Sequence, residues 1–151
     1  MALHSALTDS DGIHEPKGIS TASNNEVYVA NGSGSGTWAP TFYTITSRFN
    51  DVSVADTIYI PVPYAGTVAK VVTVLDGAIT GANDTITVRN AAGTSMGTIT
   101  ITQVGSAAGD VDTLVPVSNN TIANDSFVRL DADGASGTAQ ILYVTVVIER
   151  S

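Results

Sequence analysis

From Thr41 onward the sequence alternates apolar and polar residues with a period of two, which is the spacing of side chains along a β-strand. In the segment 85–89, TITVR, Ile86 and Val88 would face one side of a sheet, and the threonines and the arginine would face the other. The full pattern predicts eight strands, at residues 42–49, 57–63, 66–75, 85–90, 97–104, 112–117, 126–131 and 139–149. None of the segments between them shows the apolar period of a helix.

The segments between these strands carry residues that favour tight turns, such as Asp76-Gly77 and the run Asp131-Ala-Asp133-Gly134. Hydrophobic residues make up 43% of the chain, which is enough for a core, and charged residues only 13%. Short strands joined by such turns predict an all-β fold, a jelly-roll-like β-sandwich of about eight antiparallel strands. We expect this domain to span residues 41–151.

In residues 139–149 both faces of the strand are apolar, and residues 68–75 are similar. Ile141, Tyr143 and Val147 fall on one face. A two-layer sandwich buries one face of each strand, so the second face needs cover from the N-terminal segment, from a loop or from another subunit. We expect an oligomer, a homotrimer in particular, and the interface candidates are the residues of the other face: Leu142, Val144, Val146 and Ile148.

The first 40 residues have a different composition and are expected to form an extended arm with a Gly/Ser-rich linker. They contain one strand-like run, residues 26–30, and the linker-like stretch 31–36, NGSGSG. Val27, Val29 and Trp38 are too few to offset the ordering entropy of about 40 residues, at roughly 1–2 kcal/mol each. We therefore predict that residues 1–40 order against another protein.

The sequence holds few groups that could carry out catalysis. Its two histidines, His4 and His14, both lie in the arm, where neighbours that fix a tautomer and a pKa are absent. The chain has no cysteine, which excludes disulfides and thiolate zinc sites. Three pairs of carboxylates, Asp9/Asp11, Asp110/Asp112 and Asp131/Asp133, could supply oxygen ligands to calcium, but none continues into a twelve-residue calcium loop. We expect no enzyme activity, no cofactor and no metal site.

The formal net charge of −8 and the pI of about 4.3 describe an acidic surface. Such a surface repels phosphate backbones and anionic lipids, so we expect neither nucleic acid nor membrane as a partner. The first residues, MALHSALTDSDG, lack the cationic and apolar regions of a secretory signal. We expect the protein to be made and kept in a cytoplasm unless it leaves within a larger particle.

Exposed aromatic residues are the side chains through which a β-sandwich would bind carbohydrate. Tyr43, Tyr59 and Tyr143 lie inside predicted strands, where we expect them to be packing residues. Tyr64 and Trp38 lie outside those strands, where they could contact a partner. For Trp38, at the junction of the arm and the domain, we expect instead that it seals the sandwich where the arm enters.

Residues 13–38, IHEPKGISTASNNEVYVANGSGSGTW, resemble the N-terminal segment of tailed-bacteriophage capsid decoration (cement) and head-fibre proteins. The matching positions are His14, Glu15, Pro16, Lys17, Gly18, Val27, Tyr28, Val29, residues 36–37 and Trp38. Beyond Pro40 the similarity is looser and consists of Thr-rich strands, Asp-Gly turns and the final VTVVI strand.

This resemblance implies a structural virion protein that is assembled in the bacterial cytoplasm and binds the outer surface of a capsid. Its partners would be the major capsid protein and further copies of itself, often in trimers. The matched residues of the arm would then dock on the shell. The alternative is a head- or tail-fibre module whose loops, near residues 76–84 or 131–137, bind a host cell-surface glycan.

Overall fold

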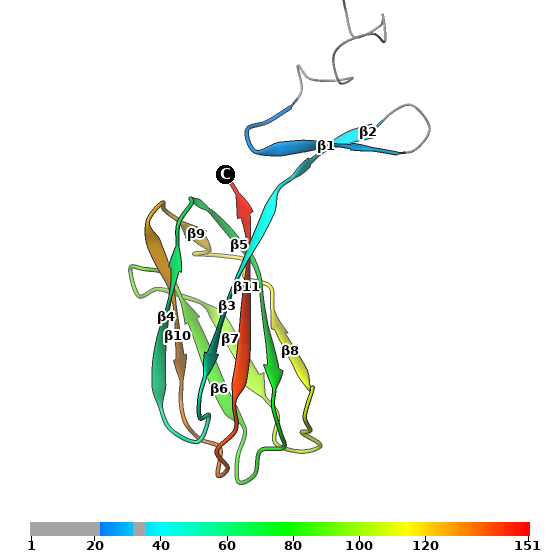
Figure 1. Cartoon of the computed structure of the whole chain (residues 1–151). Coiled ribbons are helices and arrows are strands. Elements are labelled where there is room, and N and C mark those ends of the chain that lie inside the picture. The colour runs from blue at the N-terminus through cyan, green and yellow to red at the C-terminus, as the bar shows by residue number, and fades with distance from the viewer. Residues whose placement is uncertain (1–21, 32–35) are drawn as a thin grey trace, which may run out of the picture. The chain divides into compact units, whose positions relative to one another are not determined.

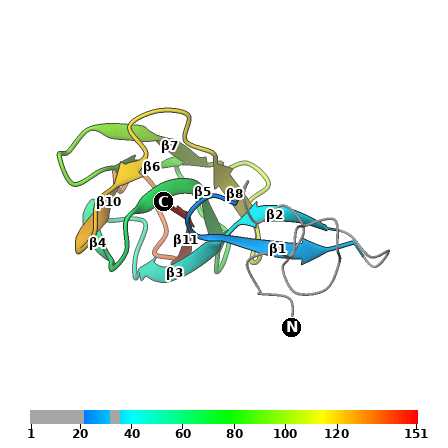
Figure 2. The ribbon, with the colours of Figure 1, turned by 90° about the horizontal axis from the view of Figure 1, so that it is seen from above.

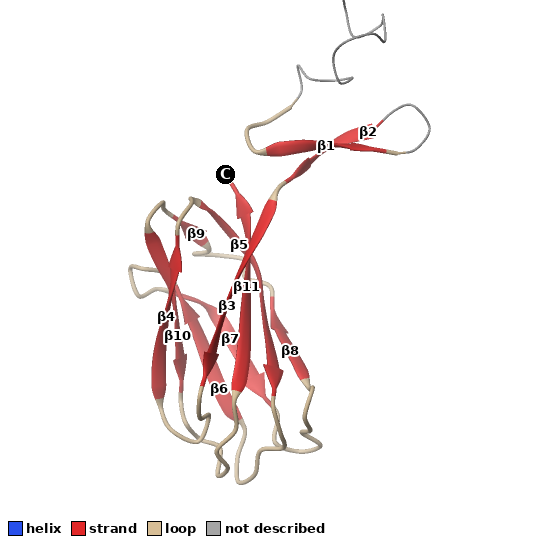
Figure 3. Ribbon diagram, in the orientation of Figure 1, coloured by secondary structure: helices blue, strands red, loops and turns tan. Residues whose placement is uncertain are grey.

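A computed structural model describes residues 22–31 and 36–151 of the chain. The chain divides into two compact units: residues 1–41 together with Ser151, and residues 42–150. The described parts consist of strands and loops without a helix (Figure 3), and so include none that could cross a membrane.

The described part of the first unit is an antiparallel β-hairpin. Strand β1 (Glu26–Ala30) was predicted as a strand, and it pairs with β2 (Gly36–Pro40) in a register that places Tyr28 opposite Trp38. At the base of the hairpin, the amide and hydroxyl groups of Thr41 both donate to the carbonyl oxygen of Asn25, at 3.1 and 2.7 Å. The expectation of an extended arm is thus wrong for these residues.

The second unit is a sandwich of two antiparallel sheets, which form the two layers seen in Figures 1 and 2. One sheet has the order β4 (Asp56–Val62), β10 (Ser126–Ala132), β6 (Asp84–Arg89), β7 (Ser95–Ile101). The other has the order β3 (Phe42–Phe49), β11 (Leu142–Arg150), β5 (Gly66–Leu75), β8 (Val111–Leu114), with the short β9 (Thr121–Ile122) also paired to β5. All of these pairs are antiparallel.

The strand order identifies the sandwich as a jelly roll. If β9 is set aside and the remaining strands are counted from β3, one sheet contains the first, eighth, third and sixth strands and the other the second, seventh, fourth and fifth. This order results when a long antiparallel ribbon folds over on itself, which gives two Greek keys. The predicted antiparallel β-sandwich is confirmed, and each of its eight predicted strands overlaps an observed one.

The core lies between the two sheets and is built from alternate residues of nearly every strand. On β11 the inward residues are Leu142, Val144, Val146 and Ile148, each exposed by 1% or less. These four side chains pack against the opposite sheet of the same chain. The expectation that they form an oligomer interface is therefore wrong, because the sandwich itself buries the face that was assigned to a second subunit.

Candidate functional site

The hairpin presents two different faces. Tyr28 and Trp38 lie directly opposite each other, and their rings meet edge to face with centroids 5.4 Å apart. Val27 and Val29 alternate with Tyr28 and so lie on the other face, where they are 48% and 49% exposed. The hairpin therefore has an aromatic pair on one side and exposed apolar side chains on the other.

Four of the residues predicted to dock on a partner can be placed. Val27, Tyr28, Val29 and Trp38 all belong to the hairpin, whereas the predicted motif His14, Glu15, Pro16, Lys17 and Gly18 lies outside the described residues. Within the described part of the chain, β1 pairs only with β2 and has no strand on its other side. A strand edge of this kind can accept an additional strand from another protein.

The outward face of β4 and β10 carries an exposed aromatic pair. Tyr59 is 59% exposed, and its ring meets that of Phe127 edge to face at a centroid distance of 5.2 Å. Tyr143, on the outward face of β11, is 44% exposed. The expectation of packing residues is wrong for Tyr59 and Tyr143, because each lies on the solvent side of its sheet, whereas Tyr43 does pack against the core. Tyr64 is 54% exposed.

An ion-pair cluster lies beside Tyr59. Asp131 accepts hydrogen bonds from Nε of Arg129 at 2.7 Å, from Nε of Arg89 at 2.8 Å and from the hydroxyl of Thr57 at 2.8 Å. Partial burial acts to raise the pKa of Asp131, but these three donors outweigh it and hold the pKa below its usual value. Asp131 is therefore an ionised residue committed to two arginines, and not a free calcium ligand.

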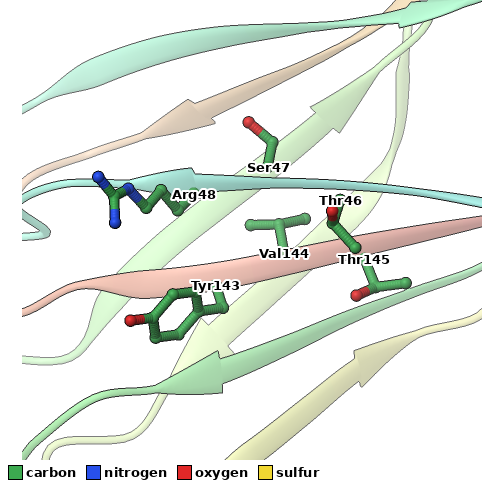
Figure 4. A pocket seen from close by; sticks show the side chains of 6 residues that line it. All are labelled: Thr46, Ser47, Arg48, Tyr143, Val144 and Thr145. Atoms are coloured by element: carbon green, nitrogen blue, oxygen red, sulfur yellow. The ribbon is translucent and has the colours of Figure 1, made fainter.

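A shallow, open hollow of about 540 Å³ lies on β3 and β11 (Figure 4). It is lined by Thr46, Ser47, Arg48, Tyr143, Val144 and Thr145. Arg48 and Tyr143 are cross-strand neighbours in the β3–β11 register. The hollow thus pairs one tyrosine with one arginine, as Tyr59 and Arg129 are paired on the opposite sheet.

The most perturbed carboxyl group of the sandwich is Asp84, at the start of β6. It is fully buried, and its Oδ1 accepts hydrogen bonds from the amides of Gly134 at 3.0 Å and Ala135 at 3.3 Å. Burial, and then the nearby Asp133, raise its pKa to about 7. The sequence patterns did not single out Asp84, because Asn83-Asp84 has the composition of an ordinary polar turn and its burial is seen only in the fold.

Asp84 and Asp133 do not have the surroundings of a calcium site. Backbone amides from Thr85 and Ala135 also donate to Asp133, so the pair is surrounded by donors, whereas calcium binding requires six to eight oxygen ligands. Within residues 22–31 and 36–151 no group of three or more acidic, His or Cys side chains is placed to hold a metal ion. The neighbouring Asp84 carboxyl group is the main cause of the lowered pKa of Asp133, whereas the pKa of Asp84 is raised, so a proton on the pair resides on Asp84.

No protein-family model and no curated protein matches this sequence. Among solved structures, a chain of the capsid asymmetric unit of cyanophage Pam1 is 19% identical with a TM-score of 0.42, over 74% of this chain and 84% of that chain. A structure of Bacillus endospore appendages, described as a novel family of disulfide-linked pili, is 16% identical with a TM-score of 0.34, over 74% and 88%. Likeness at this level carries no argument about function.

Proposed function

We propose that this chain is a capsid decoration protein, a structural virion protein that binds the outer surface of a bacteriophage shell and stabilises it without a catalytic step. The observation that carries the proposal is the hairpin of residues 26–40, which belongs to a unit separate from the sandwich and leaves Val27 and Val29 exposed. Val27 and Val29 also fall within residues 13–38, the segment that resembles phage decoration and head-fibre proteins.

The division of the chain supports the proposed roles of its two parts. Among the described residues, the buried core of the sandwich runs from Phe49 to Ile148, with Tyr43 and Ile45 packed against it, so the sandwich has a core of its own. An isolated two-stranded hairpin, in contrast, is marginally stable in water and gains from packing against another surface. In this proposal the hairpin docks on the shell, through its Val27/Val29 face and the open edge of β1, and the sandwich projects outward.

A trimer would strengthen this attachment. Three hairpins on one particle make the later contacts intramolecular, which can raise the apparent affinity by ~10²–10⁴. The subunit contact then has to use surfaces other than the buried face of β11. The outward face of β5 and β11 offers half-buried Val72, Val74 and Val147 beside exposed Tyr143. Light scattering of the purified full chain measures its mass and tests the trimer directly.

The test of the proposal is binding of the full chain to undecorated capsids from the same phage. Replacing Val27 and Val29 together by serine is expected to weaken binding at least about tenfold, because it removes the apolar area that docking buries. The matched control replaces Val104 and Val117 of the sandwich by serine, since these are also exposed, by 80% and 93%.

Two further results complete the test. A chain that lacks residues 1–41 should remain folded and lose capsid binding. Saturated binding of the intact protein should raise the temperature at which capsids disrupt, because a ligand that binds only the assembled shell favours it by mass action. Equal binding by the intact chain, the hairpin variant and the truncated chain would rule out docking through the hairpin.

A further inference from the structure

The outward face of the β4-β10-β6-β7 sheet carries two ordered rows of side chains. The strand register aligns Tyr59 with Arg129 and Arg129 with Arg89 in one row. In the next row it aligns Thr57 with Asp131, Asp131 with Thr87, and Thr87 with Thr98. Neighbouring strands lie about 4.8 Å apart, so the first row spans roughly 10 Å across three strands and the second roughly 14 Å across four, about the length of a short oligosaccharide.

The groups of these rows are held in place before any ligand binds. Asp131 fixes both arginines through their Nε atoms, and a terminal nitrogen of Arg89 also donates to the carbonyl oxygen of Gly93 at 3.2 Å. The Nε contact does not use the terminal guanidinium nitrogens of Arg129, whose side chain is 36% exposed. Side chains fixed in this way lose little entropy when they bind a ligand.

The same face combines an exposed ring with unused hydrogen-bonding capacity. The ring of Tyr59 rests against Phe127 and stays 59% exposed. A carboxylate has about four acceptor positions, and Asp131 uses three of them for Arg89, Arg129 and Thr57, so one remains. A ring beside fixed donors and a spare acceptor matches a sugar, which has an apolar face and a rim of hydroxyl groups.

The charge of the face indicates an acidic ligand. Two arginines and one aspartate occupy the outward positions of these four strands, a net charge of +1 on a chain with a formal charge of −8. Asp133 follows directly after β10. The Arg48/Tyr143 pair of the opposite sheet lacks this support, because among the described residues only Asp131 forms ion pairs with arginine. That pair therefore serves as an internal comparison.

We propose that Tyr59, Phe127, Arg89, Arg129 and Asp131 form a binding platform for an acidic saccharide. A sugar ring stacks on Tyr59, its carboxylate pairs with the terminal nitrogens of Arg129, and a hydroxyl group donates to Asp131. This platform lies on the face of a sheet, and it shares only Asp131 with the segments 76–84 and 131–137 to which the fibre alternative assigns glycan binding. It does not depend on the decoration role, since capsid docking is assigned to the hairpin.

Calorimetric titration of the full chain with uronate oligomers tests the proposal. The probes are hyaluronan hexasaccharide and oligogalacturonate, with maltohexaose as the neutral comparison. Binding of at least one acidic oligomer is expected, with little binding of maltohexaose and with an affinity that falls as salt is raised. Arg129→Gln should weaken it at least about tenfold, the loss expected when a contact to a charged group is removed. Tyr59→Ser should weaken it as well, because it removes the ring on which the sugar stacks.

Matched variants separate the platform from general effects on the surface. Arg48→Gln removes the arginine of the opposite sheet and should leave binding unchanged, and Tyr59→Phe should retain it because the ring remains. Circular dichroism establishes that each variant is folded. Three results would overturn the proposal: no acidic oligomer binds, maltohexaose binds equally well, or Tyr59→Ser and Arg129→Gln weaken capsid attachment but no saccharide contact.

Discussion

Replacing the buried carboxyl group of Asp84 by an amide (Asp84→Asn) should remove a pH dependence from the stability of the sandwich. Asp84 is fully buried, its Oδ1 accepts from two backbone amides, and its Oδ2 has no hydrogen-bond donor in the described structure. An asparagine keeps the acceptor for both amides and can donate from Nδ2 to Asp133. The variant therefore mimics the neutral carboxyl group at every pH.

The size of the effect follows from the difference in pKa between the folded and unfolded states. The pKa of Asp84 is about 7 in the folded protein and 3.8 as an unperturbed group. Its favourable contribution is fully present below about pH 4 and is lost as pH rises toward 7, because only the unfolded chain releases the proton in that range. The loss is about 1.4 kcal/mol per pH unit and levels off at about 4 kcal/mol above pH 7.

Urea unfolding at several pH values between 4.5 and 8.5, followed by far-ultraviolet circular dichroism, measures this difference. The single tryptophan, Trp38, belongs to the hairpin unit, so circular dichroism is used to follow the sandwich. At low pH the two proteins should have similar free energies of unfolding, and above pH 7 the variant should be more stable by up to about 4 kcal/mol. Parallel stability curves, with a constant difference across this range, would show that Asp84 is already ionised and would refute the reasoning.

Three further changes test packing, backbone conformation and the ion-pair cluster. Leu142→Ala should destabilise the sandwich by about 2–5 kcal/mol in urea unfolding, independent of protein concentration, because Leu142 is a core residue and not an interface residue. Gly134→Ala should lower the melting temperature more than Gly93→Ala: both have positive φ, but only at Gly134 would a Cβ lie 2.1 Å from the Ala55 amide nitrogen. Asp131→Asn should weaken the Arg89 and Arg129 contacts, measured as greater motion of both guanidinium groups by NMR.

The period-two pattern was sufficient to predict the strands of the sandwich. It was not sufficient to predict which face of the last strand points into the core. Strands 42–49 and 66–75 were predicted at the residues where β3 and β5 are found. Residues 139–149 have two apolar faces, and alternation alone cannot tell which of them meets the opposite sheet. The register settles this, because Leu142 pairs with Phe49 and Leu75, and all three point into the core.

The candidate sites depend on contacts between residues that are distant in the sequence, which explains why they were harder to predict. Thr57 and Asp131 are 74 positions apart, and Arg89 and Asp131 are 42 apart, yet their side chains meet on one sheet face. Tyr59 lies within a strand both in the prediction and in the structure. Only the position of that strand in the sandwich determines whether its ring is buried or exposed. Sequence therefore indicated the residue types, whereas the fold determines which of them act together.

Strand β2 was missed because Gly36 and Pro40 are poor strand formers and the Gly/Ser run before them is typical of a linker. Its presence changes the energetics of the proposed docking. An extended arm would lose conformational entropy on contact, at roughly 1–2 kcal/mol per residue. The hairpin is already partly ordered by its own strand pairing and the Tyr28–Trp38 contact, so it loses less when it binds. A preformed hairpin with an exposed Val27/Val29 face should thus bind more tightly than a disordered segment of the same composition.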